Sequence, residues 1–284
     1  VPWTRIKKWF DEGSYTPYTD RNPEDLIKVL TDVKKKVPEW IRLNRVVRDI
    51  PNTTLDGDTY IYGGNKVTNL RQILEQRMKQ EGTFCKCIRC REPRRSTDMF
   101  EYAQIVYREY WASFGKEHFI SIESGSCVNS VFDNVTKQWK LNGKQEPGII
   151  YGFIRLRLNM AKDGTKFLME NDAFPNIQSA AFIRELHVYG QVATRSKDKG
   201  VKYSKTQHQG IGKTLLNAAE KIACNNRYKQ IAVISGIGVK NYYRSNGYNE
   251  LDTYMVKDLP LVTLFSGFMH MLFFFIIMLL IVII

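Results

Sequence analysis

The chain has 284 residues, which is enough for one large domain or two modest ones with a substantial hydrophobic core. This length excludes the small secreted folds that depend on disulfides for their stability. Lysine and arginine outnumber the acidic residues by 42 to 29, and the resulting charge of +13 favours a polyanionic partner, such as nucleic acid or an acidic membrane surface.

The first part of the chain, residues 1–95, is predicted to be mainly helical. It begins at Val1 without the apolar region of a signal peptide, and we expect it to be a piece of a longer sequence. Asn22 and Pro23 are typical of a helix start, and Pro38 ends that helix. A second helix is predicted from Leu70 to Gly82. Between the two helices, the segment IRLNRVVRDIP is predicted to form a strand.

Three cysteines lie within six residues, in the segment TFCKCIRCREPRR. They are Cys85, Cys87 and Cys90, with the spacing C-x-C-x2-C. Thiolates this close can occupy three corners of a tetrahedral zinc site, and a structural site needs a fourth ligand, for which His187 or His118 are the candidates. The alternative is that the three thiols are simply partly buried beside a basic turn.

From about residue 98 the pattern predicts strands. Residues 105–111 and 118–122 flank a short polar segment and are predicted to form a hairpin. Two longer segments, GIIYGFIRLRLN at 148–159 and AAFIRELHVYGQV at 180–192, are rich in strand-forming residues and predicted to be antiparallel neighbours. The sequence then changes to helical spacing after residue 207, with Leu215, Leu216 and Ala219 on one face.

The junction before that helix contains two glycines, in the order Gln207-x-x-Gly210-x-Gly212. Glycines at a helix N-terminus let bare backbone N–H groups approach a pyrophosphate, and the helix dipole favours its negative charge. A glycine loop alone is weak support for such a site. It is followed by a predicted buried strand at 229–236 and by the segment GVKNYYRSNGYNEL.

Together these motifs resemble the GNAT acetyltransferase superfamily, through Q-x-x-G-x-G and Y-x-x-x-G-Y at Tyr243 to Tyr248. The segments RELHVYG, TQHQGIGKTLL and IAVISGIGVKNYYRSNGY narrow the resemblance to the catalytic subunit of Elongator and its single-chain homologues. Upstream, RVVRDIP, GGNKVTNLRQ and CKCIRCRE extend it over roughly residues 1–257.

The resemblance implies an α/β fold with several parts. These are the C-terminal remnant of a radical S-adenosylmethionine (SAM) barrel at 1–80, a Cys-rich basic linker with the candidate zinc site at 81–97, and a GNAT domain with a mixed, mostly antiparallel sheet at 98–258. In this family an iron–sulfur cluster is held by C-x3-C-x2-C or a longer-spaced variant. That motif is absent from this sequence, so S-adenosylmethionine and the cluster are expected only for the full-length family.

The resemblance also implies the acetyl-CoA site. Tyr243, with Tyr242 as the alternate, is expected to protonate the leaving thiolate. The strand edge at Glu185, Leu186, His187 and Val188 is expected to pair with the pantetheine amides. The remaining cofactor contacts are expected from Gln207, Gln209, Gly210, Ile211, Gly212 and Lys213.

The implied activity is acyl transfer in carboxymethylation of the tRNA wobble uridine, with protein lysine as a rival acceptor and a non-catalytic tRNA-binding remnant as the other alternative. Other Elongator-like subunits or a second copy are expected partners. The tRNA contacts are expected from seven arginines, whose charge suits phosphates: Arg42, Arg45, Arg48, Arg89, Arg91, Arg94 and Arg95.

The last 24 residues, 261–284, contain no charged residue. As a helix they would measure about 36 Å, which is enough to cross a hydrocarbon core of about 30 Å. The sequence therefore predicts a C-terminal transmembrane helix and a tail-anchored protein that faces the cytoplasm from the mitochondrial outer membrane or the endoplasmic reticulum. The alternative is that the tail is translated non-coding sequence and the protein is cytoplasmic.

Overall fold

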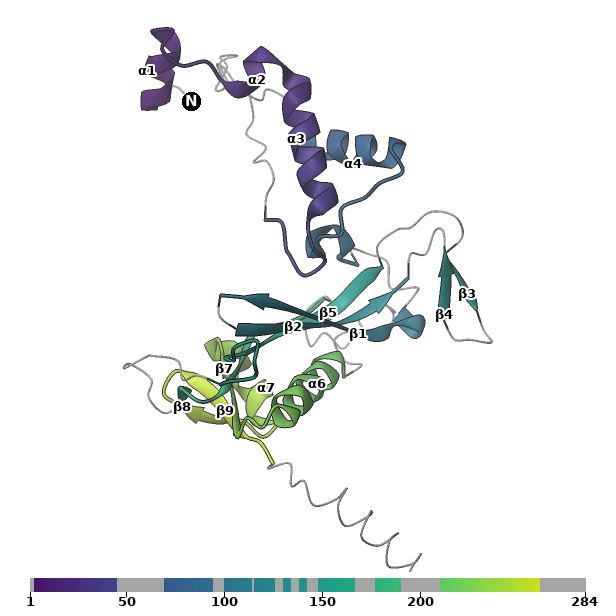
Figure 1. The fold of residues 1–284 in the computed structure, drawn as a ribbon, viewed down its shortest axis with the longest axis vertical. Coiled ribbons are helices and arrows are strands. Elements are labelled where there is room, and N and C mark those ends of the chain that lie inside the picture. The colour runs from purple at the N-terminus through teal and green to yellow at the C-terminus, as the bar shows by residue number, and fades with distance from the viewer. Residues whose placement is uncertain are drawn as a thin grey trace, which may run out of the picture. The chain divides into compact units, whose positions relative to one another are not determined.

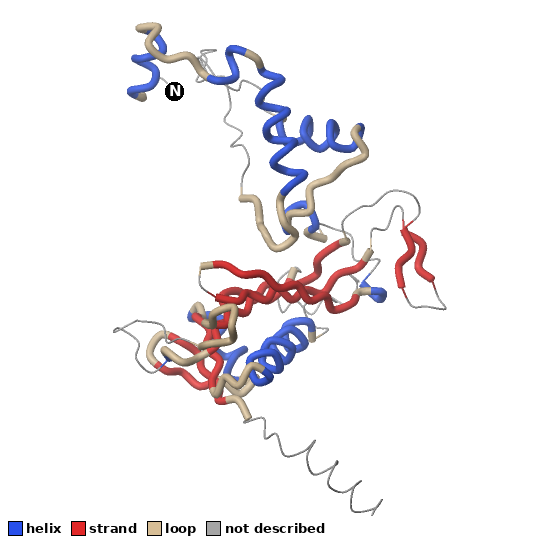
Figure 2. The backbone as a smooth tube through the Cα atoms, in the orientation of Figure 1, coloured by secondary structure: helices blue, strands red, loops and turns tan. Residues whose placement is uncertain are grey.

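The computed structural model describes residues 3–44, 69–93, 100–113, 115–125, 130–133, 138–141, 148–166, 177–189 and 210–260. The chain divides into two compact units, one of residues 1–104 and 123–151 and the other of residues 105–122 and 152–284. Helices predominate up to residue 91 and strands from residue 104 onward (Figure 2). The order of helical and strand-rich parts thus follows the change of pattern in the sequence.

The helices of the first unit begin and end where local chemistry predicts. The elements are α1 (Arg5–Asp11), α2 (Tyr18–Arg21), α3 (Pro23–Lys36), α4 (Leu70–Gln80), η1 (Ile88–Arg91) and η2 (Phe100–Tyr102) (Figure 1). The Asn22 side chain accepts a hydrogen bond from the Glu24 backbone N–H at the start of α3. Gly82 follows α4 with a positive φ of 66°, which glycine adopts without the strain of a side chain.

The described strands form a seven-stranded sheet and a separate two-stranded one. The large sheet has the order β1-β2-β5-β6-β7-β9-β8, and β3 pairs with β4. Their bounds are β1 (Gln104–Ala112), β2 (Gly115–Ser124), β3 (Ser130–Asp133), β4 (Gln138–Leu141), β5 (Ile149–Leu158), β6 (Ala181–Val188), β7 (Gln230–Ile234), β8 (Asn249–Leu251) and β9 (Tyr254–Asp258). The predicted hairpin and the antiparallel pairing of β5 with β6 are confirmed. The strand predicted within residues 41–51 falls partly outside the described residues, and residues 41–44 are not in a strand.

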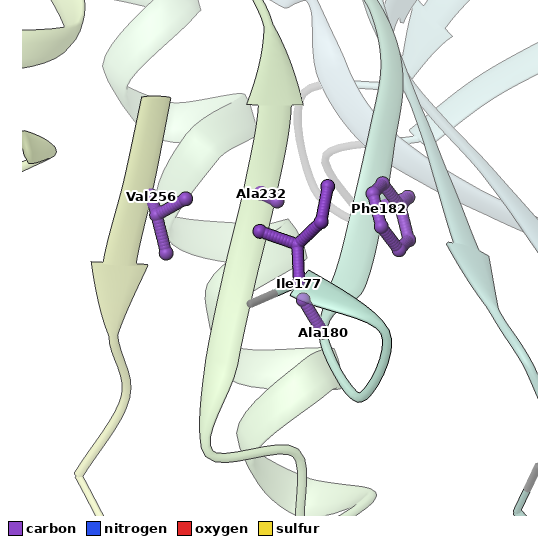
Figure 3. Close-up of a cluster of buried hydrophobic side chains, with 5 residues drawn as sticks. All are labelled: Ile177, Ala180, Phe182, Ala232 and Val256. Carbon is purple, nitrogen blue, oxygen red and sulfur yellow. The ribbon is translucent and has the colours of Figure 1, made fainter. Parts of the chain in front are cut away.

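The core of the second unit joins three neighbouring strands. Phe182 of β6 is paired in register with Ala232 of β7, which is paired with Val256 of β9. Ile177 and Ala180, in the turn before β6, cover these side chains (Figure 3). The helix α6 (Ile211–Asn225) contributes the buried side chains of Leu215, Leu216 and Ala219, and it is followed by η4 (Ile237–Val239) and α7 (Lys240–Arg244). Burial of these apolar groups keeps the strands and α6 together.

The predicted C-terminal transmembrane helix is corrected. In the part of the chain that the structure describes, no helix is both long enough and apolar enough to cross a membrane. Residues 261–284, where the helix was predicted, lie outside the described residues. The same finding contradicts the prediction of a tail-anchored protein at the mitochondrial outer membrane or endoplasmic reticulum, and it gives the expected membrane partner no support. Hydropathy and length are necessary conditions for a spanning helix, and the sequence offered nothing beyond them.

Candidate acetyl-CoA and thiol sites

The first turn of α6 begins at a glycine. Gly210 is the N-cap residue, with a positive φ of 77°, a conformation that favours glycine, and no side chain among the described residues caps the helix. A Cβ built on Gly210 would meet no described atom within 4 Å. Ile211 is buried and Lys213 is exposed, so the first turn combines a fixed backbone with an exposed cation. Such a helix start can bind a phosphate. Gln207 and Gln209, which were predicted to contribute, lie outside the described residues.

The second half of β6 has a free backbone edge. Among the described residues, β6 pairs with β7 only at Ala181, Phe182 and Ile183. It stays paired with β5 on its other side as far as Val188. The backbone of Glu185 to Val188 therefore has no strand partner on the β7 side within the described residues. An extended ligand with amide groups can pair with such an edge as an additional strand.

Two glycines bring the helix and the strand edge together. A Cβ on Gly152 of β5 would lie 2.9 Å from Ile211 Cγ2 and 3.0 Å from the His187 carbonyl oxygen. A Cβ on Gly212 would lie 2.4 Å from the Tyr242 hydroxyl oxygen and 3.8 Å from Val188 Cγ2. The first turn of α6, the end of β6 and the Tyr242 hydroxyl thus converge at one place. Sequence reasoning missed Gly152, although a glycine inside a strand pattern is a signal of close backbone approach.

The two predicted catalytic tyrosines differ in accessibility. Tyr243 is buried, with its ring centroid 5.4 Å from that of Tyr242 and 5.6 Å from that of Tyr248. Burial, and secondarily Tyr242, raises the pKa of Tyr243 to about 12. Tyr242 is 37% exposed, and burial of its phenol raises its pKa as well. Both phenols keep their protons at neutral pH, and the Tyr242 hydroxyl lies beside Gly212 in the first turn of α6.

Two side chains of the predicted strand edge contact neighbouring side chains. Glu185 accepts a hydrogen bond from Arg155 Nε at 2.9 Å. The exposed His187 ring stacks on Phe153 at 5.7 Å and meets the Tyr189 ring at 4.4 Å. Leu186 and Val188 are half-buried. The side chain of Arg155 was not foreseen, because an isolated Arg in a strand pattern gives no sign of its partner.

The three predicted thiols lie together in the first unit. The sulfur atoms of Cys85, Cys87 and Cys90 are all within 4.8 Å of one another, and the first two residues are buried. Hydrogen bonds from the other two thiols lower the pKa of Cys87, so one thiolate is favoured in the cluster. Three sulfur ligands at this separation suit a tetrahedral metal ion.

No described histidine joins the thiols in this cluster. The His187 ring packs on Phe153 and Tyr189, and His118 Nε2 is buried without a hydrogen-bond partner. Burial lowers the pKa of His118, which keeps its ring neutral. The ammonium group of Lys34, a buried residue, lies 3.8 Å from Cys90 Sγ. The Cys85 thiol and this cation lower the pKa of Cys90, but the Cys87 thiolate and burial outweigh them, so the pKa of Cys90 is raised.

Of the seven predicted tRNA-binding arginines, three are in the described residues. Arg42 forms an ion pair with Glu92 at 2.8 Å and remains partly exposed, and Arg89 is half-buried. Arg91 is buried, and its guanidinium binds Glu123 and the carbonyl oxygens of Lys86 and Glu39. Arg45, Arg48, Arg94 and Arg95 lie outside the described residues.

Comparisons with known proteins find relatives over most of the chain. Residues 1–80 match the family described as "Radical_SAM C-terminal domain". The "tRNA uridine(34) acetyltransferase" of Methanocaldococcus jannaschii is 33% identical over 266 residues, which are 91% of this chain and 42% of that protein. The human "Elongator complex protein 3" is 32% identical over 262 residues, covering 90% of this chain and 40% of its own length.

A solved structure extends the similarity to the fold. The archaeal Methanocaldococcus infernus Elp3 with an N-terminal deletion is 31% identical and superposes with a TM-score of 0.65, covering 91% of this chain and 53% of that one. This chain spans about two fifths of the length of the curated relatives it matches. On these matches residues 1–80 belong to the radical SAM C-terminal domain family, and the chain as a whole is similar to the C-terminal portion of the Elongator catalytic subunit.

Proposed function

We propose that this chain is an acetyl-CoA-dependent acyltransferase of the Elongator type that acts in wobble-uridine modification of tRNA. The observation that supports it best is the convergence of the open α6 turn, the free edge of β6 and the Tyr242 hydroxyl. The names of the relatives, tRNA uridine(34) acetyltransferase and Elongator complex protein 3, give the substrate class.

In this proposal the backbone N–H groups from Gln209 to Gly212 bind the pyrophosphate, and the edge from Glu185 to Val188 pairs with the pantetheine amides. Bound acetyl-CoA supplies an activated acetyl thioester. The chain then has to stabilise the departing thiolate, and a protonated tyrosine can donate its O–H to it. Tyr243 stays protonated because burial raises its pKa to about 12, and the Tyr242 hydroxyl lies closer to the helix turn.

The experiment measures acetyl-CoA binding by calorimetry and acetyl-CoA hydrolysis with and without tRNA. We expect Tyr242→Phe and Tyr243→Phe together to reduce turnover by about 10²-fold or more while acetyl-CoA still binds. Tyr107→Phe is the control, since Tyr107 is 56% exposed on β1 and outside the site. A wild-type protein that does not bind acetyl-CoA would contradict the proposal and favour a non-catalytic tRNA-binding role. Acetylation of a lysine peptide without any effect of tRNA would favour protein lysine as the acceptor.

We propose that the tRNA contacts Arg42 and Arg89, and that Arg45, Arg48, Arg94 and Arg95, which lie outside the described residues, add further phosphate contacts. Phosphate contacts release counterions, so the affinity should fall steeply as salt rises. Replacing Arg89 by Gln should weaken tRNA binding and lower the slope of log affinity against log salt concentration by about one unit.

Gel filtration of the protein with and without tRNA tests whether two copies associate. Because a relative is named Elongator complex protein 3, other Elongator-like subunits are further expected partners.

We also propose a metal ion at the thiols of Cys85, Cys87 and Cys90, with a fourth ligand still to be identified. The ion would hold the Cys segment against Val37 and Met78, which share its small core. Metal analysis of the purified protein and of Cys87→Ser tests this. The radical SAM cofactor and iron–sulfur cluster belong to the full-length relatives, and no described or undescribed segment of this sequence carries their C-x3-C-x2-C motif. No step is assigned to them here.

A further inference from the structure

The strand β6 contains a bulge at the point where it leaves β7. Arg155 of β5 is paired with Glu185, but the next residue of β5, Leu156, is paired with Ile183. Arg184 is therefore an extra residue on β6. The last position at which β6 pairs with β7 is also Ile183. The free edge from Glu185 to Val188 thus begins immediately after the bulge.

Two consecutive side chains of the bulge reach the same face of the sheet. Arg184 donates a hydrogen bond to Glu117 of β2 at 2.7 Å, and Glu185 accepts one from Arg155 of β5 at 2.9 Å. In a regular strand, neighbouring side chains point to opposite faces. Both ion pairs can form together only in the bulged register, so both stabilise it against the regular one.

Glu117 is held rigidly at the centre of this network. It is 1% exposed, and its Oε1 accepts from Arg157 at 2.9 Å as well as from Arg184. Its other oxygen, Oε2, is buried without a hydrogen-bond partner. Burial and the charge of Glu117 raise the pKa of the Tyr110 phenol. A buried carboxylate needs its cations, so the attraction to both guanidinium groups is strong.

Arg157 in turn connects Glu117 to the turn between β1 and β2. Its guanidinium donates to the carbonyl oxygens of Ala112 at 3.1 Å and Ser113 at 2.6 Å, and its Nε donates to Asn159. A Cβ at Gly115 would lie 2.7 Å from the Arg157 guanidinium carbon, so the glycine makes room for this side chain. Arg157 is therefore fixed from several sides, whereas the Arg184 side chain is 54% exposed and depends on Glu117.

We propose that Glu117 is a positioning residue for the acetyl-CoA site: through Arg184 it holds the β6 bulge that frees the strand edge for the cofactor. The role rests on the proposed function, because the edge serves the cofactor only if acetyl-CoA binds there. Glu117 itself lies on β2 and needs no contact with the cofactor.

The test compares Glu117→Gln, Arg184→Gln and the double variant in acetyl-CoA hydrolysis. We expect each single change to raise KM for acetyl-CoA about tenfold with a much smaller change in kcat, and the double variant to match the single ones, because all three lose the same contact. Glu117→Asp should recover part of the affinity. Glu109→Gln is the matched control, since Glu109 pairs with Lys116 on the neighbouring strand and its side chain is 58% exposed. If Glu117→Gln does not fold, the same measurements on Arg184→Gln test the proposal.

Hydrogen exchange of the protein without ligand provides a second readout. Glu117→Gln and Arg184→Gln should change the exchange of the amides from Arg184 to Val188 and leave those of α6 unchanged. The inference is overturned if the folded variants keep the wild-type KM and the wild-type amide exchange. It is also overturned if the fold-increase in KM of the double variant equals the product of the two single increases. If the wild-type protein does not bind acetyl-CoA, the proposed function fails, while the exchange data still show whether Glu117 holds the bulge.

Discussion

The strand β2 carries two buried glutamates that work differently in the two units. Glu123, in the first unit, pairs with Arg91, and both side chains are at most 8% exposed. Glu117, in the second unit, shares one oxygen between Arg157 and the largely exposed Arg184. The first pair ties the segment after the thiols to a strand, and the second reaches the bulge of β6. Arginines from the same basic sequence thus have internal roles, and charge alone does not show which of them can contact RNA.

Each unit has its own cluster of buried side chains. The thiol cluster packs with Val37 and Met78 in the first unit, whereas a cluster in the second unit extends over β6, β7 and β9. A change in one cluster should therefore affect its own unit most.

Loss of the thiol cluster should affect the first unit alone. Cys87→Ser, or removal of metal by a chelator, is expected to increase amide exchange in α3 and α4 strongly, because structural metal ions supply about 10 kcal/mol or more to small zinc-binding peptides. Acetyl-CoA binding should remain. Hydrogen exchange read by mass spectrometry measures both units in one sample, and Cys224→Ser is the control outside the cluster. Equal destabilisation of α6 would contradict the independence of the two cores.

Breaking the buried ion pair between Arg91 and Glu123 should lower the stability more than breaking the exposed pair between Arg42 and Glu92. Arg91→Ala is expected to lower the free energy of unfolding by about 3–5 kcal/mol, because it removes the guanidinium from a buried ion pair with Glu123. Arg42→Ala, which breaks the more exposed pair with Glu92, should cost at most about 1 kcal/mol. Urea unfolding of both variants makes the comparison. Similar losses would show that burial does not decide the difference.

The second unit should lose stability at high pH. The pKa of Tyr243 is raised to about 12, above the value near 10 of an unfolded tyrosine, because burial favours the neutral phenol. The buried neutral phenol of Tyr243 contributes its full stabilisation below about pH 10. As the pH rises toward about 12 this contribution is lost, and the free energy of unfolding falls by roughly 2–3 kcal/mol. Tyr243→Phe should flatten this dependence in thermal unfolding between pH 9 and 12, whereas Tyr107→Phe should not. An unchanged slope in Tyr243→Phe would indicate that other groups cause the loss.

A methyl group in the glycine turn should weaken cofactor binding modestly. A Cβ on Gly212 would lie 2.4 Å from the Tyr242 hydroxyl oxygen, so Gly212→Ala must displace that ring. We expect the affinity for acetyl-CoA to fall about tenfold, or about 1.4 kcal/mol, by calorimetry. Gly238→Ala is the matched control, because its Cβ would meet nothing within 4 Å. If the two variants bind acetyl-CoA with equal affinity, Tyr242 is not part of the acetyl-CoA site.

The elements and their order could be predicted from the sequence because local signals determine them. Asn22 and Pro23 start α3, Gly210 and the spacing of Leu215 and Ala219 define α6, and alternating or apolar segments define the strands. The cysteine spacing likewise predicts three thiols close together, because residues so near in sequence cannot lie far apart. The predicted transmembrane helix failed as a prediction because length and hydropathy were its only basis.

By itself the sequence determined the family resemblance, the helix boundaries and the candidate site residues, all of which depend on neighbours within a few positions. Only the tertiary structure decided which charges are internal, that the Tyr242 hydroxyl lies beside Gly212 of α6, and that β6 is bulged at Arg184. These features join residues far apart in the chain, such as Glu117 with Arg184 and Arg91 with Glu123. A buried charge needs a counter-ion, and the fold can supply that counter-ion from a residue far away in the sequence. No local sequence pattern shows which residue it is.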